Sequence, residues 1–335
     1  MLDHKGGIMS DLQAKILNIL QKGEFHSGES LGRQLGVSRT AIWKQLQKLE
    51  ALGLQLESVK GVGYRLPDSF ELLSKPVILN YIMERHSDVP SEVEIFHSID
   101  STNKYARERA EKESFSGGVI LAENQTAGRG RRGKSWVSPF AASIYMSLVW
   151  DFEQGAESLQ GLSLAVGVGV RRALADLGLQ NIQLKWPNDI YIDGKKLGGI
   201  LLEMIGDPNG CCTVIIGIGL NVSMPSLAGE KIDQPWTDVQ SQAALPISRN
   251  ELTAVLIVKL LDLLKDFQNV GFQAYRDEWQ EADLLQNLPG TVRTVKDAIS
   301  GIVLGVDSSG ALRLGLPNGE VQRFIGGELS LRPSE

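Results

Sequence analysis

The 335-residue sequence predicts an α+β protein of several domains, because its pattern of apolar residues changes twice along the chain. Residues 11–66 fit three helices and a hairpin. Residues 90–288 alternate apolar strands with amphipathic helices, and from residue 289 onward short strands are separated by glycine turns. We therefore expect an N-terminal winged helix-turn-helix, a central mixed α/β domain and a C-terminal β-barrel.

The composition is that of an ordinary globular protein, with 42% hydrophobic and 22% charged residues. The net charge of −6 argues against a general polyanion binder, although residues 1–66 carry nine Lys/Arg and six Asp/Glu, a net charge of +3. The adjacent Cys211 and Cys212 fit neither a disulfide framework nor metal-ligand spacing. Because no signal core and no membrane-spanning apolar run is present, we expect a cytoplasmic protein without a membrane partner.

The first 66 residues have the spacing of a DNA-binding module. Ser27 and Ser38 are predicted to cap consecutive helices, and residues 54–66 to form a two-stranded wing. In the helix after Ser38, apolar residues recur at i, i+4 and i+7, which leaves polar and basic side chains on the other face. Such modules sometimes serve only as protein–protein contacts, but the positive charge favours DNA. The predicted DNA-binding residues are Ser38, Arg39, Thr40, Trp43, Lys44, Gln47 and Lys60.

The central and C-terminal parts are predicted from period and turn signals. In chain order we expect a linking helix at 70–85 interrupted by Pro76, a strand at 92–96, a helix at 102–113, strands at 119–122 and 143–150, a helix at 159–177, one strand at 184–192, strands at 196–203 and 212–223, an irregular loop at 224–247, a long helix at 249–269, a short helix at 278–288, and strands at 291–295, 300–306, 311–316 and 321–324.

A stretch rich in glycine and arginine, residues 127–134, follows the strand at 119–122. Glycine permits close backbone approach to a ligand, and arginine offers donors matched to phosphate and carboxylate oxygens, so we predict a mobile loop that closes over an anion. The spacing matches neither a Walker loop nor a dinucleotide-binding strand–loop–helix unit. A solvated turn or a nucleic-acid patch remains the alternative, but the flanking Gln125 and Trp136 favour a pocket.

Other polar residues suggest transfer chemistry without a protein nucleophile. Lys185, Asn188 and Asp189 are predicted to share one strand, and Lys196 begins the next. No histidine lies in these segments, so a histidine base or a covalent cysteine enzyme is not expected. Cations that position an anionic substrate suit phosphoryl or nucleotidyl transfer, with Mg²⁺ near the Asp189 carboxylate. Taken singly, Lys185–Asp189 could equally be a cis-proline turn and Lys196 a solubilising residue at the end of a hairpin.

In combination, six segments resemble the bifunctional biotin–protein ligases that also repress the biotin biosynthesis operon. They are DSTN (100–103), QTAGRGRRGKSW (125–136), KWPNDIY (185–191), KKLGGILLE (195–203), GIGLNV (217–222) and GGELSLR (326–332). The resemblance implies a winged helix-turn-helix at 1–67, a catalytic domain at 68–286 similar to class II aminoacyl-tRNA synthetases, and an SH3-like domain at 287–335.

The resemblance also implies a two-step reaction. Biotin and MgATP would give biotinyl-5′-adenylate, and the biotinyl group would pass to a lysine of the biotin carboxyl carrier protein. Operator DNA would be a further partner, and the protein would be a homodimer when the adenylate is bound. Two alternatives are a biotin-sensing repressor without ligase activity and a related lipoate or octanoate ligase.

Site residues follow from the matched motifs. The expected catalytic residues are Lys185, Asp189, Lys196 and Arg131. The expected biotin-binding residues are Ser101, Thr102, Asn103, Gln125, Arg129, Gly130, Arg131 and Lys196. The expected nucleotide-binding residues are Arg131, Arg132, Asn188, Asn221, Trp236 and Arg332, and Asp189 is the expected Mg²⁺ contact.

Overall fold

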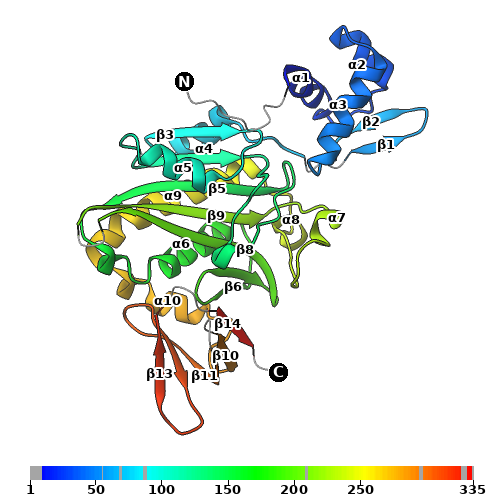
Figure 1. The fold of residues 1–335 in the computed structure, drawn as a ribbon. Coiled ribbons are helices and arrows are strands. Elements are labelled where there is room, and N and C mark those ends of the chain that lie inside the picture. Colours follow the sequence, from blue (N-terminus) through cyan, green and yellow to red (C-terminus); the bar gives the residue numbers. More distant parts are fainter. Residues whose placement is uncertain are drawn as a thin grey trace.

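The computed structural model describes residues 10–54, 56–67, 70–85, 89–207, 210–293, 297–325 and 330–333. Within these residues the chain forms three parts: an N-terminal helical module, a central sheet covered by helices, and a C-terminal sheet. Figure 1 shows the N-terminal module, in blue, and the C-terminal sheet, in orange and red, at opposite ends of the central sheet. Residues 326–329 of the GGELSLR motif lie outside the described residues.

The N-terminal module has the predicted order of three helices and a hairpin. Its elements are α1 (Asp11–Leu20), α2 (Gly28–Leu35), α3 (Arg39–Ala51), β1 (Glu57–Val59) and β2 (Gly63–Arg65). Ser27 and Ser38 cap α2 and α3 by accepting hydrogen bonds from backbone N–H groups three residues on, as predicted. The three apolar residues of α3 that were expected to face the core, Ile42, Leu46 and Leu49, are buried.

The central domain is built on a seven-stranded mixed sheet, which confirms the predicted α+β class. The strand order is β3-β4-β5-β9-β8-β7-β6, and only β3 and β4 pair in parallel. The strands are β3 (Glu92–Phe96), β4 (Gly118–Ala122), β5 (Ser143–Phe152), β6 (Ile182–Lys185), β7 (Asp189–Ile192), β8 (Lys195–Gly206) and β9 (Cys212–Asn221).

Helices cover the two faces of this sheet unequally. The apolar stripes of α6 (Leu162–Asp176) and α9 (Arg249–Val270) pack on one face and form the main core, with α4 (Lys75–Arg85) packed against α9. The other face carries α5 (Thr102–Ala110) over β4, β5 and β9, with a smaller apolar cluster, and leaves part of β8 and β9 for the arginine-rich loop. The short helices are the 3₁₀ turns Arg131–Gly133, Ala156–Leu159 and Phe272–Ala274, and α7 (Ser226–Gly229), α8 (Val239–Gln242) and α10 (Arg276–Glu281).

Three predictions about the central domain were wrong. Residues 184–192 form two antiparallel strands, β6 and β7, in place of one, and the cis-proline turn that was the alternative lies between them at Trp186–Pro187. Pro76 does not interrupt a helix, since α4 begins only at Lys75 and proline is tolerated in a first turn. The helix expected at 278–288 ends at Glu281, and residues 282–284 instead run parallel to β6.

The C-terminal domain is antiparallel β structure, as predicted, with one strand more than predicted. Its sheet has the order β13-β12-β11-β10-β14. The strands are β10 (Pro289–Arg293), β11 (Ala298–Val306), β12 (Leu312–Gly315), β13 (Val321–Phe324) and β14 (Ser330–Pro333). The indole Nε1 of Trp186 donates to the carbonyl of Gly310 at 3.2 Å, which ties this sheet to the turn between β6 and β7.

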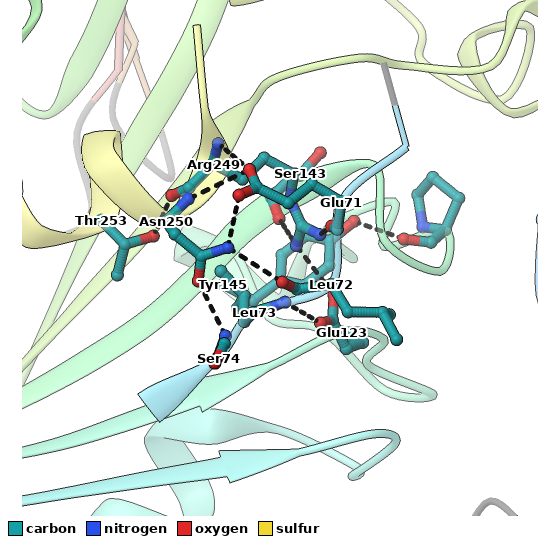
Figure 2. A network of polar contacts seen from close by, with 11 residues as sticks. Glu71, Leu72, Leu73, Ser74, Glu123, Ser143, Tyr145, Arg249, Asn250 and Thr253 are labelled. Atoms are coloured by element: carbon teal, nitrogen blue, oxygen red, sulfur yellow. Dashed lines mark hydrogen bonds and ion pairs between the residues drawn. The ribbon is translucent and has the colours of Figure 1, made fainter. Parts of the chain in front are cut away.

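A buried polar network anchors the segment that leaves the N-terminal module (Figure 2). The Arg249 guanidinium and the Glu123 carboxylate pair at 2.9 Å, and each side chain is only 1% exposed. Glu71 accepts hydrogen bonds from the backbone of Arg249 and from the side chain of Asn250, at 2.6 Å each. Glu123 also accepts the backbone N–H of Leu73. Residues 71–74 are therefore fixed to α9 and to the end of β4.

The carboxyl group of Asp283 is buried between the central and C-terminal domains, with few contacts that would stabilise its charged form. Asp283 is 8% exposed, its Oδ1 accepts the Leu285 N–H at 3.0 Å, and its Oδ2 has no partner among the described residues. Burial raises the pKa of Asp283 from 3.8 to about 6. The folded state then binds the proton more tightly than the unfolded state, so stability falls as pH rises from about 4 to about 6 and stays lower above that range.

We predict that Asp283→Asn stabilises the protein at pH 8 by about 1–3 kcal/mol, since the amide keeps the bond to Leu285 and removes the buried charge. Urea unfolding of both proteins at pH 8 and pH 4.5 measures this. The difference should shrink at pH 4.5, where the carboxyl is protonated. An equal loss of stability at both pH values would contradict the assignment.

Candidate functional site

The site begins with glycines on the sheet face that α5 covers only in part. A methyl group at Gly217 would lie 2.2 Å from Asn103 Oδ1, and one at Gly219 would lie 2.5 Å from Trp136 Cε2. Both glycines belong to β9, and their lack of a side chain allows the amide and the indole to lie directly on the strand. The glycines thus form a floor, and the predicted polar and aromatic residues lie on it.

One end of this floor carries a buried polar cluster. The side-chain oxygen of Gln125 accepts from the backbone of Thr102 at 2.9 Å and from its hydroxyl at 3.2 Å. Ser147 Oγ lies 2.8 Å from the Thr102 hydroxyl oxygen and 2.6 Å from Asn103 Oδ1. Asn103 donates to Glu203 Oε2 at 2.8 Å. Ser101, also buried, caps α5. The residues expected to bind biotin at 101–103 and 125 therefore form one connected set.

The arginine-rich loop is a compact turn in this structure. Gly130 donates to the carbonyl of Lys134 at 2.7 Å, and Trp136 donates to the carbonyl of Gly128 at 2.9 Å. Arg132, at φ 57°, is the residue at the reversal. Trp136 turns inward over Gly219, and its Nε1 is buried without a partner in the described part of the chain. The loop is thereby tethered to the floor by its closing aromatic residue.

Cations gather at the other end of the floor, around one carboxylate. Lys196 Nζ lies 2.6 Å from Asp189 Oδ1, and both side chains are at most one-fifth exposed. Arg131 donates to Asn188 Oδ1 at 3.1 Å, so the loop reaches the β6–β7 turn. Burial lowers the pKa of Lys185, an effect that Asp189 opposes and that the neighbouring Lys196 reinforces. This excess of positive charge is the arrangement expected of an anion site.

Burial also lowers the pKa of Arg131, with Asp189 acting in the opposite direction. An arginine stays protonated at neutral pH despite such a shift, but its charge is held in a poorly solvated place. An anion entering beside Arg131 would therefore meet a cation that lacks full solvation, which strengthens their attraction.

The residues expected on the nucleotide side surround the same lysine. Thr237 N–H donates to the carbonyl of Lys196 at 3.0 Å, and its own carbonyl accepts from Asn221 Nδ2 at 3.0 Å. Trp236 pairs with Lys196 through a parallel bridge and packs on Gly229. Arg332, which pairs with Thr291 in the C-terminal sheet, is close enough to lower the pKa of Lys185. The last domain thus adds a cation to the site.

Not every predicted residue points inward. Lys195 is exposed, whereas Lys196 is directed at Asp189, so the geometry separates the two adjacent lysines. Arg129 is half-exposed and lies 3.8 Å from Glu203. Sequence reasoning missed Ser147, Ser138 and Glu203. A signal existed for Ser147 and Glu203, because each is a polar residue with apolar neighbours on both sides in its strand.

All seven predicted DNA-binding residues are exposed on the N-terminal module: Ser38, Arg39, Thr40, Trp43, Lys44, Gln47 and Lys60. Arg39, Thr40 and Trp43 line a shallow hollow that Tyr64 of the wing closes. Trp43 is 47% exposed, which is unusual for a tryptophan that only fills a core.

Among the described residues, no group of three or more His, Cys, Asp or Glu side chains is placed to hold a metal ion. No described helix combines the length and apolarity required to cross a bilayer.

Three family models match the chain, one for each part. An HTH domain matches residues 12–65, the biotin/lipoate A/B protein ligase family matches residues 95–221, and the biotin protein ligase C terminal domain matches residues 291–332.

Curated relatives match almost the whole chain. The bifunctional ligase/repressor BirA of Escherichia coli is 39% identical over 96% of this chain and 97% of its own length. The protein of the same name from Bacillus subtilis is 31% identical over 87% of this chain and 89% of its own. A biotin–[acetyl-CoA-carboxylase] ligase of Paracoccus denitrificans is 34% identical over 68% of this chain and 98% of its own.

Among solved structures, the biotin protein ligase of Aquifex aeolicus in complex with biotin and ATP is similar. Its TM-score is 0.63 at 27% identity, over 73% of this chain and all of that chain.

We predict that Gly217→Ala destabilises the protein by about 1–3 kcal/mol, because the new methyl group must displace the buried Asn103 amide. Urea unfolding measures the change. Gly167→Ala in α6 is the matched control: its nearest neighbour would lie 3.4 Å away, so the variant should be neutral or up to about 1 kcal/mol more stable. Equal effects of the two substitutions would show that the Asn103 contact is not tight.

Proposed function

This chain belongs to the biotin protein ligase family, and from that premise we propose that it is a bifunctional protein: an ATP-dependent ligase that biotinylates a carrier protein, and a biotin-responsive repressor of the biotin operon. The observation that supports the ligase activity best is the floor of glycines, with a buried polar cluster at one end and Lys185, Arg131 and Lys196 at the other. This arrangement suits a polar head group and a carboxylate held close to phosphates.

In the first step, the carboxylate of biotin attacks the α-phosphorus of ATP. The new C–O–P bond forms as the bond to the pyrophosphate oxygen breaks, and no protein nucleophile is needed. We assign the polar head of biotin to Ser101, Thr102, Asn103 and Gln125. Lys196 neutralises the carboxylate and the developing adenylate, and exchanges its contact with Asp189 for one with substrate.

The phosphates are assigned to the cations on the loop and the β6–β7 turn. Arg131 already bonds to Asn188 at 3.1 Å, so closing the loop on a triphosphate requires little movement at this point. Arg129, Gly130 and Arg132 complete the loop's contribution, with the Gly130 N–H as a further donor. Asn221, Trp236 and Arg332 are assigned to the nucleoside and its phosphates.

Magnesium would enter with ATP, since the described residues hold no protein cage for it. Mg²⁺ commonly binds through one or two carboxylates and the substrate's phosphates. Asp189 pairs with Lys196 and acts electrostatically on Lys185 and Arg131, and it is the residue that we assign to that contact.

In the second step, the amine of a lysine on the biotin carboxyl carrier protein attacks the acyl carbon of the adenylate. An amide forms as the amine nitrogen releases one proton, and AMP leaves with the electron pair of the broken C–O bond. The arginine-rich loop excludes water from the mixed anhydride until the carrier arrives.

The repressor half is assigned to the N-terminal module. Arg39, Lys44 and Lys60 are exposed and form no ion pair within the described residues, so they are available to phosphates. We propose that the protein acts in the cytoplasm and that adenylate binding favours a homodimer, whose two-fold symmetry would match a two-fold operator.

Pyrophosphate exchange into ATP tests the proposed chemistry directly. Exchange that depends on biotin, and not on lipoate or octanoate, is the expected result. Exchange with lipoate or octanoate alone would make the chain a related acyl ligase. Absence of exchange with all three would leave a biotin-sensing repressor.

Arg131→Ala is predicted to release the adenylate into solution at least about tenfold faster, because the loop loses its link to Asn188 and a cation beside the phosphate. Gel filtration after adenylation, followed by measurement of bound and free biotinyl-adenylate, tests this. Arg313→Ala, which removes an exposed arginine of β12, is the control. Retention equal to that of the unaltered protein would remove Arg131 from this role.

Lys44→Ala is predicted to weaken operator binding about equally for all operator sequences and to reduce the slope of log K against log salt by about 0.9, the value for one lost phosphate contact. Titrations at several salt concentrations measure the slope. Lys15→Ala in α1, where the lysine is paired with Asp11, should leave the slope unchanged. An unchanged slope for Lys44→Ala would argue that α3 does not face the DNA backbone at this residue.

A further inference from the structure

Residues 138–141, which lie between the arginine-rich loop and β5, contact both the N-terminal module and the central domain. Phe140 is 2% exposed, and it packs in the apolar core of the N-terminal module, together with residues of α1, α2 and α3. Its backbone N–H donates to the carbonyl of Leu52, just after α3, at 2.8 Å. The two chains also approach closely, since a methyl group at Gly53 would lie 2.7 Å from Pro139 Cβ. We call residues 138–141 the junction segment.

The other side of the junction segment contacts the ligand site. Ser138 Oγ accepts from Gln125 Nε2 at 3.3 Å and donates to the carbonyl of Trp136 at 3.0 Å. The same Gln125 amide holds the backbone and hydroxyl of Thr102. A methyl group at Gly128, in the loop, would lie 2.6 Å from Ser138 Oγ. A displacement of Ser138 must therefore move the Gln125 amide and the base of the arginine-rich loop.

The frame around the junction segment is rigid. Tyr145 Oη donates to the carbonyl of Pro139 at 2.9 Å, and Ala141 N–H donates to the carbonyl of Glu123 at 2.9 Å. Figure 2 shows Tyr145 and Glu123 within the network of Arg249 and Glu71. Because Glu123 also binds Leu73, both attachments of the N-terminal module meet at this one residue, two positions before Gln125. A change in the position of the N-terminal module can therefore be transmitted to the ligand site through a short series of packed residues.

We infer that the N-terminal module positions the biotin site through the junction segment, and that Phe140 is the positioning residue through which it does so. The inference rests on the proposed function, because it concerns the binding of biotin at that site. Phe140 touches no assigned substrate residue; it acts by fixing Ser138 and, through Ser138, Gln125. By thermodynamic linkage, a ligand that orders Gln125 and the loop must also favour the packing of the N-terminal module around Phe140. That module carries α3, the helix assigned to DNA binding.

The test measures biotin-dependent pyrophosphate exchange with the full chain and resolves KM for biotin from kcat. Phe140→Ala should raise KM for biotin by about tenfold, within the usual range of coupling between sites, and change kcat by less than about twofold. Phe140→Leu should keep much of the affinity for biotin, since leucine fills most of the space that Phe140 occupies in the core of the N-terminal module. A loss of folding stability by itself would lower the amount of active enzyme and leave KM unchanged.

Two further variants keep the inference falsifiable. Gly53→Ala alters the N-terminal module, where a φ of 97° strains alanine, and its methyl group also presses on Pro139, so the variant should raise KM for biotin as well. It decides the question if Phe140→Ala does not fold. Phe152→Ala, a truncation of an equally buried phenylalanine at the far end of β5, is the matched control and should leave KM within about twofold.

The outcomes distinguish a failure of the proposed function from a failure of the coupling through the junction segment. If the unaltered protein shows no biotin-dependent exchange, the proposed function itself fails. If it does, but folded Phe140→Ala and Gly53→Ala both bind biotin with the unaltered KM, the junction segment does not couple the domains. A rise in KM for both variants, with Phe152→Ala unchanged, supports the inference.

Discussion

The buried ion pair between Arg249 and Glu123 is the contact on which the placement of the site depends. Each side chain is 1% exposed, and such a pair is stable only where hydrogen bonds replace the lost water. The two terminal nitrogens of Arg249 meet this condition by donating to the carbonyls of Glu71 and Ser143 as well as to Glu123, while its Nε has no partner among the described residues. Loss of either partner would leave an uncompensated charge, a change that typically costs about 3–5 kcal/mol. The pair therefore fixes the end of β4 relative to the start of β5 and to α9.

That fixed corner explains how the residues assigned to ligand binding come together from distant parts of the sequence. Gln125 follows Glu123 by two residues, and Asn221 pairs with Ser143 across β5 and β9. One end of the site is thus positioned by β4, and the other end is positioned by β5 and β9. Between them, Gly217 and Gly219 leave room that any larger residue would occupy. The surface of the candidate site is a property of the sheet, and the arginine-rich loop that covers it needs to supply only charge and closure.

The sequence predicted the order of most elements because their signals are local, and the resemblance of six motifs named the residues that the structure brings together at the candidate site. Helix caps such as Ser38 and the motif spacing around Lys196 depend on neighbouring residues alone. It offered the cis-proline turn at Trp186–Pro187 only as an alternative to one continuous strand, since strand period alone does not distinguish the two. It could not assign Phe140 to the N-terminal core either. An apolar residue after a loop indicates burial, and only the three-dimensional structure shows in which domain it is buried.

The position of Phe140 changes how the two activities can be related. If the two domains were joined only by a flexible linker and made no contact, an adenylate in the central domain could influence DNA binding only through the oligomeric state. Here, the chain that returns from the arginine-rich loop enters the N-terminal core before it enters β5. Closure of the loop over an anion acts on Trp136 and Ser138, which are four and two residues from Phe140 and connected to each other by a hydrogen bond. Ligand binding and the packing of the N-terminal module, which contains α3, therefore both involve the junction segment. The free energy of either process must depend on the other.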